Sequence, residues 1–377
     1  MGKYVFINQD SGYLMIDIVN AYAEAGYQCV LMTGRLVVRN RQVNSAVRIE
    51  KIIRYNRNSN LTRLWSWIIG SSQIFIKVAF KYRKWNLFIV SNPPTAVLLP
   101  LVLKNQFSLL IFDIYPDVLT ELGYSEPGSS GIRLWKGLNK KVYRKALRIY
   151  TITEGMGEVL RQYAGNNPVN VVHLWTDNSF LRPVAPGNNH FLKRHSLQDK
   201  FIVLYSGNIG LASEVDILID AAIRLASKDI LFLIIGEGAK KEPMAKRVRE
   251  LGLSNVKMLP FQPAAELPYS FSSAHLAVVA LGKGETRLAV PSKLYNFLSV
   301  GAPLLCLSSP GSEVQRLVDT YQCGKNFEPD DLEGIVGFII LLAENPVIHT
   351  RLKQNSLIAS MDFSSDNVRK FLSSERN

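Results

Sequence analysis

The residues best suited to binding chemistry lie in one short stretch, VPSKLYNFLSVG, at residues 290–301. Pro291 and Ser292 are typical of a helix start and Gly301 of a helix end, and the apolar residues between them recur at helical spacing. The free backbone N–H groups of the first turn and the ammonium group of Lys293 would together attract a phosphate or diphosphate. The alternative is an ordinary capped helix with a solvated lysine.

Four further stretches are predicted to reach the same place in the fold. Each follows an apolar, strand-like run: SGNIG at 206–210, GEG at 236–238, PFQ at 260–262 and LGKGETR at 281–287. In open parallel α/β sheets, ligands bind at the carboxyl ends of the strands. Two glycine-rich turns, a basic loop and the helix start at Pro291 would therefore converge, which favours an anion site. The alternative for the glycines is a tight strand-to-helix turn, since neither stretch has the full dinucleotide-binding spacing.

Short apolar runs alternate with helical stretches along most of the chain. The runs are YVFI, YQCVLM, NLFIV, SLLIF and LRIYTI in the first half, and FIVLYS, ILFLIIG, VKMLPF, HLAVVAL and PLLCLS in the second. Such alternation predicts an α/β fold with two parallel sheets covered by helices. The length of 377 residues also suits two domains. Residues 183–200 are rich in Pro, Gly and Asn, so we expect a linker there, between a first domain at 1–182 and a second from residue 201.

The net charge of +13 is concentrated in the first half of the chain. From Thr33 to Lys84 there are twelve Arg and Lys residues and a single acid, Glu50, and residues 132–148 add seven Arg and Lys residues without an acid. Residues 61–85 mix Trp, Ile and Phe with Lys and Arg, as expected of a helix that lies on an anionic bilayer surface. The alternative is a core helix with a solvated basic edge. Nucleic-acid binding explains the charge less well, because no recognition motif accompanies it.

The cysteine content and the hydropathy predict the compartment. Three cysteines are too few, and too deep in apolar runs, for a disulfide framework or a zinc site. The first residues lack the pattern of a signal peptide, and no segment reaches the roughly 18 to 20 apolar residues of a membrane span. We expect a cytoplasmic protein, peripheral at the inner face of the plasma membrane.

The second half of the chain resembles the donor-binding domain of the retaining glycosyltransferases of family 4, which have the GT-B fold. The resemblance rests on FIVLYSGNIGLASEVDILIDAA, on LIIGEG with a basic helix and LSNVKMLPFQPAAELP after it, and on VPSKLYNFLSVGAPLL, in that order. In the first half, SNPPTAVLLP and FDIYPDVLTELG are similar to loops of the branch that builds bacterial surface polysaccharides. The resemblance implies two Rossmann-like domains facing a central cleft. The nucleotide-sugar domain would span 201–360, and a C-terminal helix at 361–377 would cross back to the first domain.

This resemblance also implies an activity. A sugar would pass, with retention, from a nucleotide-diphosphate donor to a lipid-linked or oligosaccharide acceptor in O-antigen, capsule or exopolysaccharide synthesis. UDP is the favoured nucleotide, GDP stays open, and neither a metal nor another cofactor is implied. The donor-binding residues carried over are Gly207, Asn208 and Gly210 near the phosphates, Glu237 and Gly238 near the nucleotide, Pro260 and Phe261 at the base, Pro291, Ser292, Lys293 and Arg287 at the diphosphate, and Glu285 and Asn296 near the ribose or the sugar.

Two positions depart from the family pattern. Many members have an Arg and a Lys after the first strand of the second domain, where this chain has Asn208 and Ser213. Many also have two spaced glutamates, the second of which binds the ribose. Here Asn296 takes the second position, and Glu285 is the nearest acid upstream of it. An asparagine can bond ribose hydroxyls but cannot supply a charged hydrogen bond.

In the first half, Asp113 and Asp117 follow the strand-like run SLLIF. They are candidates for orienting or activating the acceptor hydroxyl. Their alternatives are turn bonding by Asp113 and helix capping by Asp117. The candidates for acceptor contacts follow two other strands: Ser11, Gly12, Tyr13, Pro93 and Pro94.

Two other functions stay open at this point. One is a nucleotide-sugar epimerase of the same fold, which would need an acidic, histidine-rich cleft with a base in each domain, and the sequence offers none. The other is a non-catalytic nucleotide-sugar-binding protein or membrane-surface scaffold. A nucleotide sugar that binds and never turns over would support the latter.

Overall fold

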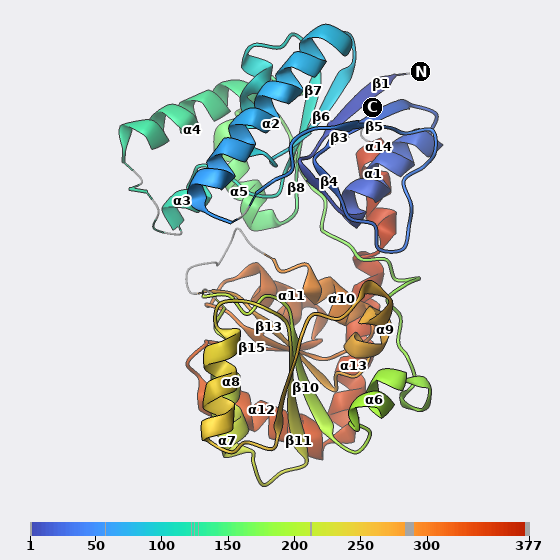
Figure 1. Ribbon diagram of the computed structural model, residues 1–377, viewed down its shortest axis with the longest axis vertical. Coiled ribbons are helices and arrows are strands. Elements are labelled where there is room, and N and C mark those ends of the chain that lie inside the picture. The colour runs from blue at the N-terminus through green and yellow to red at the C-terminus, as the bar shows by residue number, and fades with distance from the viewer. Residues whose placement is uncertain are drawn as a thin grey trace. The chain divides into compact units, whose positions relative to one another are not determined.

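The computed structural model describes residues 2–56, 58–121, 123, 125–126, 128–211, 213–282 and 290–373. The chain divides into two compact units, shown in Figure 1. Unit 1 is Met1–Leu174 together with Asp366–Asn377, and unit 2 is Trp175–Ser365. The 3₁₀ turn η4 (Ser365–Val368) spans the second boundary.

Unit 1 is built on a seven-stranded parallel sheet with the order β5-β3-β1-β6-β7-β8-β9. Its strands are β1 (Lys3–Ile7), β3 (Gln28–Thr33), β5 (Arg48–Lys51), β6 (Asn86–Val90), β7 (Phe107–Ile111), β8 (Arg148–Thr151) and β9 (Val169–Val171). The central strands are continuous apolar runs, as expected of a parallel sheet covered by helices on both faces. The helices are α1 (Tyr13–Glu24), α2 (Asn60–Lys81), η1 (Pro94–Leu101), α3 (Asp117–Glu121), α4 (Ser130–Tyr143), α5 (Glu154–Ala164) and α14 (Arg369–Ser373). A short parallel pair, β2 (Asp10–Ser11) and β4 (Arg35–Leu36), lies outside this sheet.

The last helix of the chain completes the core of unit 1. The ring centroid of Phe371 in α14 lies 4.7 Å from that of Tyr150 and 5.8 Å from that of Phe88. The hydroxyl of Tyr22, in α1, donates to the carbonyl oxygen of Phe371 at 3.4 Å. Accordingly, α14 lies beside α1 in Figure 1. Burial of this aromatic cluster fixes a segment that is more than 200 residues away in sequence from its neighbours.

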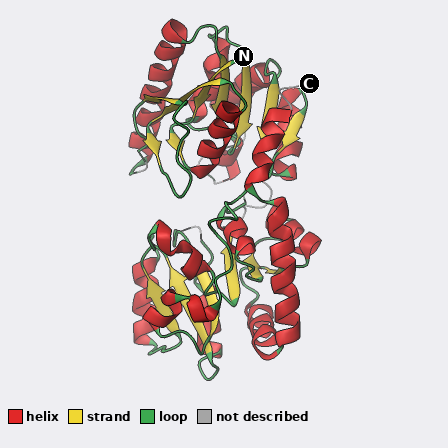
Figure 2. Ribbon diagram, turned by 90° about the vertical axis from the view of Figure 1, so that its right-hand side faces the viewer, coloured by secondary structure: helices red, strands yellow, loops and turns green. Residues whose placement is uncertain are grey.

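Unit 2 has a six-stranded parallel sheet with the order β12-β11-β10-β13-β14-β15. Its strands are β10 (Phe201–Ser206), β11 (Ile230–Ile235), β12 (Val256–Leu259), β13 (Leu276–Ala280), β14 (Leu304–Leu307) and β15 (Gly324–Phe327). Helices flank the strands in Figure 2. They are η2 (Pro186–Asn188), α6 (His190–His195), α7 (Ile217–Arg224), α8 (Lys241–Glu250), η3 (Ala264–Glu266), α9 (Leu267–Phe271), α10 (Lys293–Ser299), α11 (Glu313–Tyr321), α12 (Leu332–Glu344) and α13 (Pro346–Asp362).

The predicted α/β class with two parallel sheets is confirmed, and each of the ten predicted apolar runs contains a strand. The segment expected as a linker, 183–200, instead packs within unit 2. It forms η2 and α6, and Phe191, Leu192 and Leu197 are buried. The side chain of Asn189 accepts from the first backbone N–H groups of α6 and donates to the carbonyl of Tyr269 at 2.9 Å. These apolar side chains need a core, so this stretch cannot serve as a solvated connection.

None of the described helices is by itself long and apolar enough to cross a membrane. Only α12 and α13 pass that test, and only as a pair bent by 101°. Ile335, Ile339 and Leu342 of α12 are buried in the core of unit 2. The three cysteines are free and buried.

Candidate active site

A cavity of about 450 Å³ lies at the carboxyl ends of β10 and β13 in unit 2. These strands are hydrogen-bonded neighbours, so the loops that follow them meet at one edge of the sheet. The lining residues are Tyr205, Ser206, Gly207, Asn208, Ser213, Ala280, Leu281, Gly282, Val290, Pro291, Ser292 and Lys293. The predicted turn after the first strand and the predicted helix start thus lie in one cavity.

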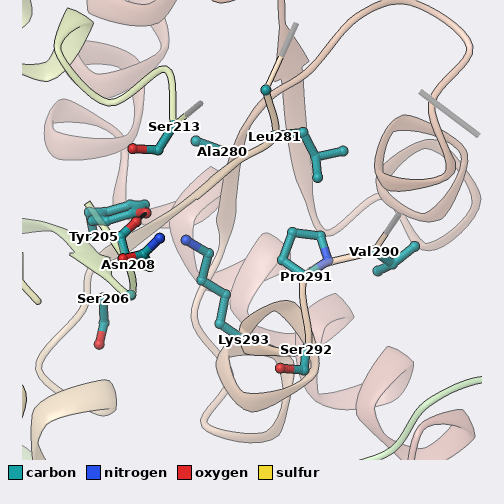
Figure 3. A pocket seen from close by; sticks show the side chains of 12 residues that line it. Tyr205, Ser206, Asn208, Ser213, Ala280, Leu281, Val290, Pro291, Ser292 and Lys293 are labelled. Carbon is teal, nitrogen blue, oxygen red and sulfur yellow. Dashed lines mark hydrogen bonds between the residues drawn. The ribbon is translucent and has the colours of Figure 1, made fainter. Parts of the chain in front are cut away.

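Lys293 is the cation of this cavity. Figure 3 shows its side chain extending from the start of α10 toward Tyr205 and Asn208. Its Nζ lies 3.8 Å from the centroid of the Tyr205 ring, a cation–π contact. No ion pair joins it to a carboxylate of the described residues. Burial lowers the pKa of Lys293 from 10.5 to about 7. An ammonium held this way has no counter-ion among the described residues, and a bound anion would supply one.

The turn after β10 is held by Tyr205. Its hydroxyl donates to the carbonyl oxygen of Asn208 at 2.6 Å, and burial raises the pKa of Tyr205 to about 12, so this group stays a donor. A Cβ atom at Gly207 would lie 3.0 Å from the Nζ of Lys293. Glycine at this position therefore leaves the space that the ammonium group occupies.

The second glycine-rich turn supports the first. A Cβ at Gly236 would overlap the carbonyl oxygen of Gly207, and a Cβ at Gly238 would overlap the backbone of Ile209. Ile209 donates its N–H to the carbonyl of Glu237 at 2.8 Å. The Glu237 carboxylate forms an ion pair with Lys241 at 2.7 Å. Glu237 and Gly238 thus brace the turn after β10 and do not line the cavity.

The helix start differs in detail from the expected cap. Helix α10 begins at Lys293, and the Ser292 side chain makes no capping hydrogen bond to it. The helix has seven residues and ends at Ser299, just before the predicted stop at Gly301. Leu294 and Phe297 are fully buried and fix its orientation, so Pro291 and Ser292 are held at the cavity by packing.

Several predicted donor residues lie away from this cavity. Asn296 is 4% exposed, and its Oδ1 accepts from the Thr176 hydroxyl at 2.8 Å, a bond inside unit 2. Pro260 and Phe261 follow the edge strand β12, and Phe261 is 53% exposed. The carbonyl of Gly210 accepts from the Ser213 hydroxyl at 2.7 Å. Glu285 and Arg287 lie outside the described residues.

In unit 1 the two candidate carboxylates, those of Asp113 and Asp117, differ in how exposed they are. Both oxygens of Asp117 are engaged, because Lys136 bonds Oδ1 at 2.7 Å and the Tyr163 hydroxyl bonds Oδ2. Burial and this bond raise the pKa of Tyr163. Asp113 is exposed, and its backbone N–H donates to the hydroxyl of Ser91 at 3.2 Å.

Asp113 also borders a small pocket, together with one of the predicted acceptor residues, Pro94, and with two aromatic rings. The rings belong to Tyr115 and Trp135, which stack with centroids 6.1 Å apart. The structure therefore brings a carboxylate next to an aromatic surface.

The remaining acceptor candidates are buried or half-buried. Ser11 is buried, donates to the carbonyl of Asn8 and accepts from the Thr33 hydroxyl. Pro93 is buried as well, whereas Gly12 and Tyr13 are half-buried at the start of α1. The Arg39 guanidinium lies 4.4 Å from the centroid of the Tyr13 ring. Burial raises the pKa of Tyr13 to about 12.

Among the described residues, no group of three or more His, Cys, Asp or Glu side chains could hold a metal ion. The sequence-based prediction missed Tyr205 and Ala280 of the lining. Tyr205 lies directly before the predicted turn at 206–210, so the rule that ligands meet strand ends could have included it.

Comparison with known proteins adds three findings. Residues 188–357 match the family model of the Glycosyl transferases group 1. The probable glycosyltransferase WbjE of Pseudomonas aeruginosa is 25% identical over 288 residues, which cover 74% of this chain and 72% of that protein. The putative colanic acid biosynthesis glycosyl transferase WcaI of Escherichia coli K12 is 27% identical over 237 residues, covering 61% and 58%.

Among solved structures, Anabaena HepE in complex with UDP and glucose superimposes with a TM-score of 0.72. The match covers 100% of this chain and 99% of HepE at 14% identity, a likeness that supports the fold alone. The two parallel-sheet, Rossmann-like units have the GT-B fold. The match of residues 188–357 to the Glycosyl transferases group 1 model agrees with the resemblance to family 4.

Proposed function

We propose that this glycosyltransferase uses a nucleoside-diphosphate sugar, with UDP as its nucleotide, and builds a bacterial surface polysaccharide on a lipid-linked or oligosaccharide acceptor. The observation that carries the donor proposal is Lys293, a buried cation without a carboxylate partner among the described residues, at a cavity of about 450 Å³. A diphosphate is the substrate group that would pair with it. Asn208, Ser206 and Ser292 add polar groups around the same space.

The charge at Lys293 is placed for leaving-group stabilisation. In transfer with retention, the bond between the sugar C1 and the β-phosphate oxygen breaks, and the acceptor oxygen bonds C1 on the same face. The departing phosphate oxygen takes the acceptor proton, and the nucleoside diphosphate leaves. An ammonium near that oxygen acts where negative charge develops, which is the place where fixed charge accelerates the step most.

UDP is favoured by two considerations. The HepE structure contains UDP and glucose and shares the fold over its whole length. The family 4 resemblance carries Gly207, Asn208 and Lys293 over to the phosphate side, and these three residues meet at the cavity. The names of WbjE and WcaI concern glycosyl transfer, and for WcaI colanic acid synthesis, which supports a polysaccharide acceptor.

For the acceptor, Asp113 is a better candidate than Asp117. A carboxylate that is held by Lys136 and Tyr163 cannot also receive a substrate hydroxyl without losing one of these partners. Asp113 is exposed and lies beside Tyr115 and Trp135. We assign Asp113 to orienting the acceptor hydroxyl and Asp117 to holding α4 against α5.

Contact with an anionic membrane surface is part of this proposal. On its outer side, α2 exposes apolar residues where a helix of a soluble domain carries polar ones: Leu61, Leu64, Trp65, Ile68, Ile69, Ile76 and Phe80. Phe80 is 84% exposed. Residues 132–148 add Arg133, Lys140 and Lys141, all of them exposed. Apolar and basic groups together are what an anionic bilayer surface binds.

The direct test is turnover. The chain would be incubated with UDP-glucose, UDP-galactose, UDP-N-acetylglucosamine or GDP-mannose and a bacterial lipid extract, and both nucleotide release and sugar incorporation into lipid would be measured. Acceptor-dependent UDP release that Lys293→Met abolishes supports the proposal. Release of GDP alone would overturn the choice of nucleotide. Tight binding of a nucleotide sugar without any transfer would favour a non-catalytic binding protein.

A further inference from the structure

A second cavity, of about 500 Å³, lies in unit 1 between the C-terminal half of α2 and the segment that follows η1. We call it the α2 groove. Its lining residues are Phe75, Ala79, Arg83, Lys84, Val102, Leu103, Lys104 and Asn105. None of them belongs to the donor cavity of unit 2 or to the small pocket at Asp113.

The α2 groove is amphipathic. Phe75, Ala79, Val102 and Leu103 supply apolar surface, and Val102 is 68% exposed without a covering group. The other side carries three exposed cations, Arg83, Lys84 and Lys104. An apolar wall beside clustered positive charge matches a ligand that has an acyl chain and an anionic head.

The three cations are unneutralised. No ion pair joins Arg83, Lys84 or Lys104 to a carboxylate of the described residues. Between Glu50 and Asp113 the sequence contains no acidic residue at all. The carboxylate of Glu50 is itself occupied by Lys77 at 2.9 Å and Lys81 at 2.5 Å.

The basic end of the groove is also held in place. The Asn105 side-chain amide donates to the carbonyl of Tyr82 at 2.8 Å and to that of Trp85 at 2.7 Å. This clamp ties the segment carrying Lys104 to the turn carrying Arg83 and Lys84. The cations are therefore presented by a fixed backbone, which lowers the entropic cost of gathering them around one anion.

We propose that the α2 groove binds one anionic phospholipid of the membrane surface, with its phosphate among Arg83, Lys84 and Lys104 and an acyl chain along Phe75 and Val102. The site rests on the proposed membrane contact of α2 and deepens it. The exposed apolar residues of α2, which include Ile76 and Phe80 next to the groove, would enter the same bilayer surface.

The first experiment uses short-chain lipids as monomers. Calorimetric titration of the full chain with dihexanoyl phosphatidylglycerol should saturate at one lipid per chain, with binding at least roughly tenfold tighter than that of dihexanoyl phosphatidylcholine. The triple variant Arg83→Ala/Lys84→Ala/Lys104→Ala should weaken it roughly a hundredfold, since each basic residue near an anionic surface contributes about 1 kcal/mol, or about fivefold. Ala79→Trp, which fills the groove without a change of charge, should also abolish binding.

The matched control is Lys246→Ala/Arg247→Ala/Arg249→Ala, which removes the same charge from the exposed surface of α8 in unit 2. It should keep the lipid affinity of the wild type. Equal loss in both triple variants would show that net charge alone is responsible, and would overturn the site. So would equal affinity for the two lipids, or inorganic phosphate binding in the groove as tightly as the lipid.

Flotation with phosphatidylcholine vesicles, with and without phosphatidylglycerol, then tests the site at a bilayer. The Arg83, Lys84 and Lys104 variant should float less on the anionic vesicles, while it still binds UDP in unit 2. Unchanged flotation would contradict the proposal. A wild-type chain that binds the lipid and no nucleotide would refute the donor proposal and leave the α2 groove standing.

Discussion

The ammonium of Lys293 lies 3.8 Å from the centre of the Tyr205 ring, at the point where β10 and α10 meet the same cavity. The ring holds the cation without neutralising it, and burial lowers the pKa of Lys293 to about 7. In the unliganded protein, the pKa of the Lys293 ammonium therefore lies close to neutral pH. A nucleoside diphosphate would stabilise the ammonium form and draw a proton onto it.

UDP binding should therefore depend on pH in a defined direction. Below pH 7 Lys293 is already charged, so affinity should be nearly flat. Above pH 7 the free enzyme must take up a proton to bind, and affinity should fall by up to about tenfold per pH unit. Calorimetry at pH 8 in HEPES and in Tris would reveal this proton uptake as a difference in apparent enthalpy. Affinity that is the same from pH 7 to pH 9 would contradict the role of Lys293.

The Lys293→Met variant should be more stable than the wild type at low pH. The folded pKa of Lys293 lies below its unfolded value, so the folded state binds fewer protons between pH 7 and pH 10.5, and this group's contribution to stability rises with pH across that window. Lys293→Met removes the free-energy cost of burying a charged ammonium, and this cost is largest below pH 7. We expect a gain of roughly 1 kcal/mol at pH 6 and less at pH 9.5, measured by urea unfolding. A destabilised variant at pH 6 would argue that the cation–π contact outweighs desolvation.

Gly236→Ala should distort the cavity at Lys293, although Gly236 does not line that cavity. The new methyl group would overlap the carbonyl of Gly207, and relieving this contact must shift the turn that faces Lys293. We expect a loss of about 1–3 kcal/mol in stability and a weaker affinity for UDP. Gly337→Ala, in α12, is the control because its Cβ would meet no atom within 4 Å; it should gain stability by about 0.5–1 kcal/mol and leave UDP binding unchanged. Unaltered UDP affinity in Gly236→Ala would mean that the two turns are not coupled.

Glu50 is predicted to make unit 1 sensitive to acid. Hydrogen bonds from Lys81, opposed in part by burial and aided by Lys77 and Tyr82, lower the pKa of Glu50 from 4.5 to about 2. A lowered folded pKa contributes stability above pH 4.5 that is lost as the pH falls toward 2. Glu50→Gln should cost about 2 kcal/mol at pH 7 and almost nothing near pH 2. The control is Glu24→Gln, which removes an exposed pair with Arg41 and should change stability by less than about 1 kcal/mol. A pH-independent effect of Glu50→Gln would refute the ionic role.

The fold was largely predictable because its strands are short apolar runs bounded by polar turns. In the two large sheets, the strands that escaped prediction are β5, β9 and β15, with the sequences RIEK, VNV and GKNF. They lie at the edges of their sheets, where one side needs no apolar burial. The expected linker failed for a related reason, since Phe191, Leu192 and Leu197 are scattered among polar residues, Pro and Gly, yet they are buried in unit 2.

The site was predictable where its residues follow the carboxyl ends of parallel strands, because ligands bind at that edge of an open α/β sheet. The turn at Gly207 directly follows β10, and α10 begins at Lys293 after the loop that follows β13; both line the cavity. Asn296 shows the limit of such reasoning. Its partner Thr176 lies 120 residues away, and nothing local indicates that the pair is buried. Tyr205 was missed because a tyrosine that ends an apolar run looks like a core residue until Lys293 is placed over it.

The most direct test of the donor site is a calorimetric titration with UDP and GDP at pH 7 on three proteins. These are the wild type, Lys293→Met, and Lys325→Met, which removes a similar lysine over an aromatic ring, that of Phe327, outside the cavity. We predict that UDP binds the wild type and Lys325→Met equally, and Lys293→Met at least roughly tenfold more weakly, as expected for loss of a charged bond to phosphate. If UDP binds all three proteins alike, or binds none of them, the cavity at Lys293 is not the donor site.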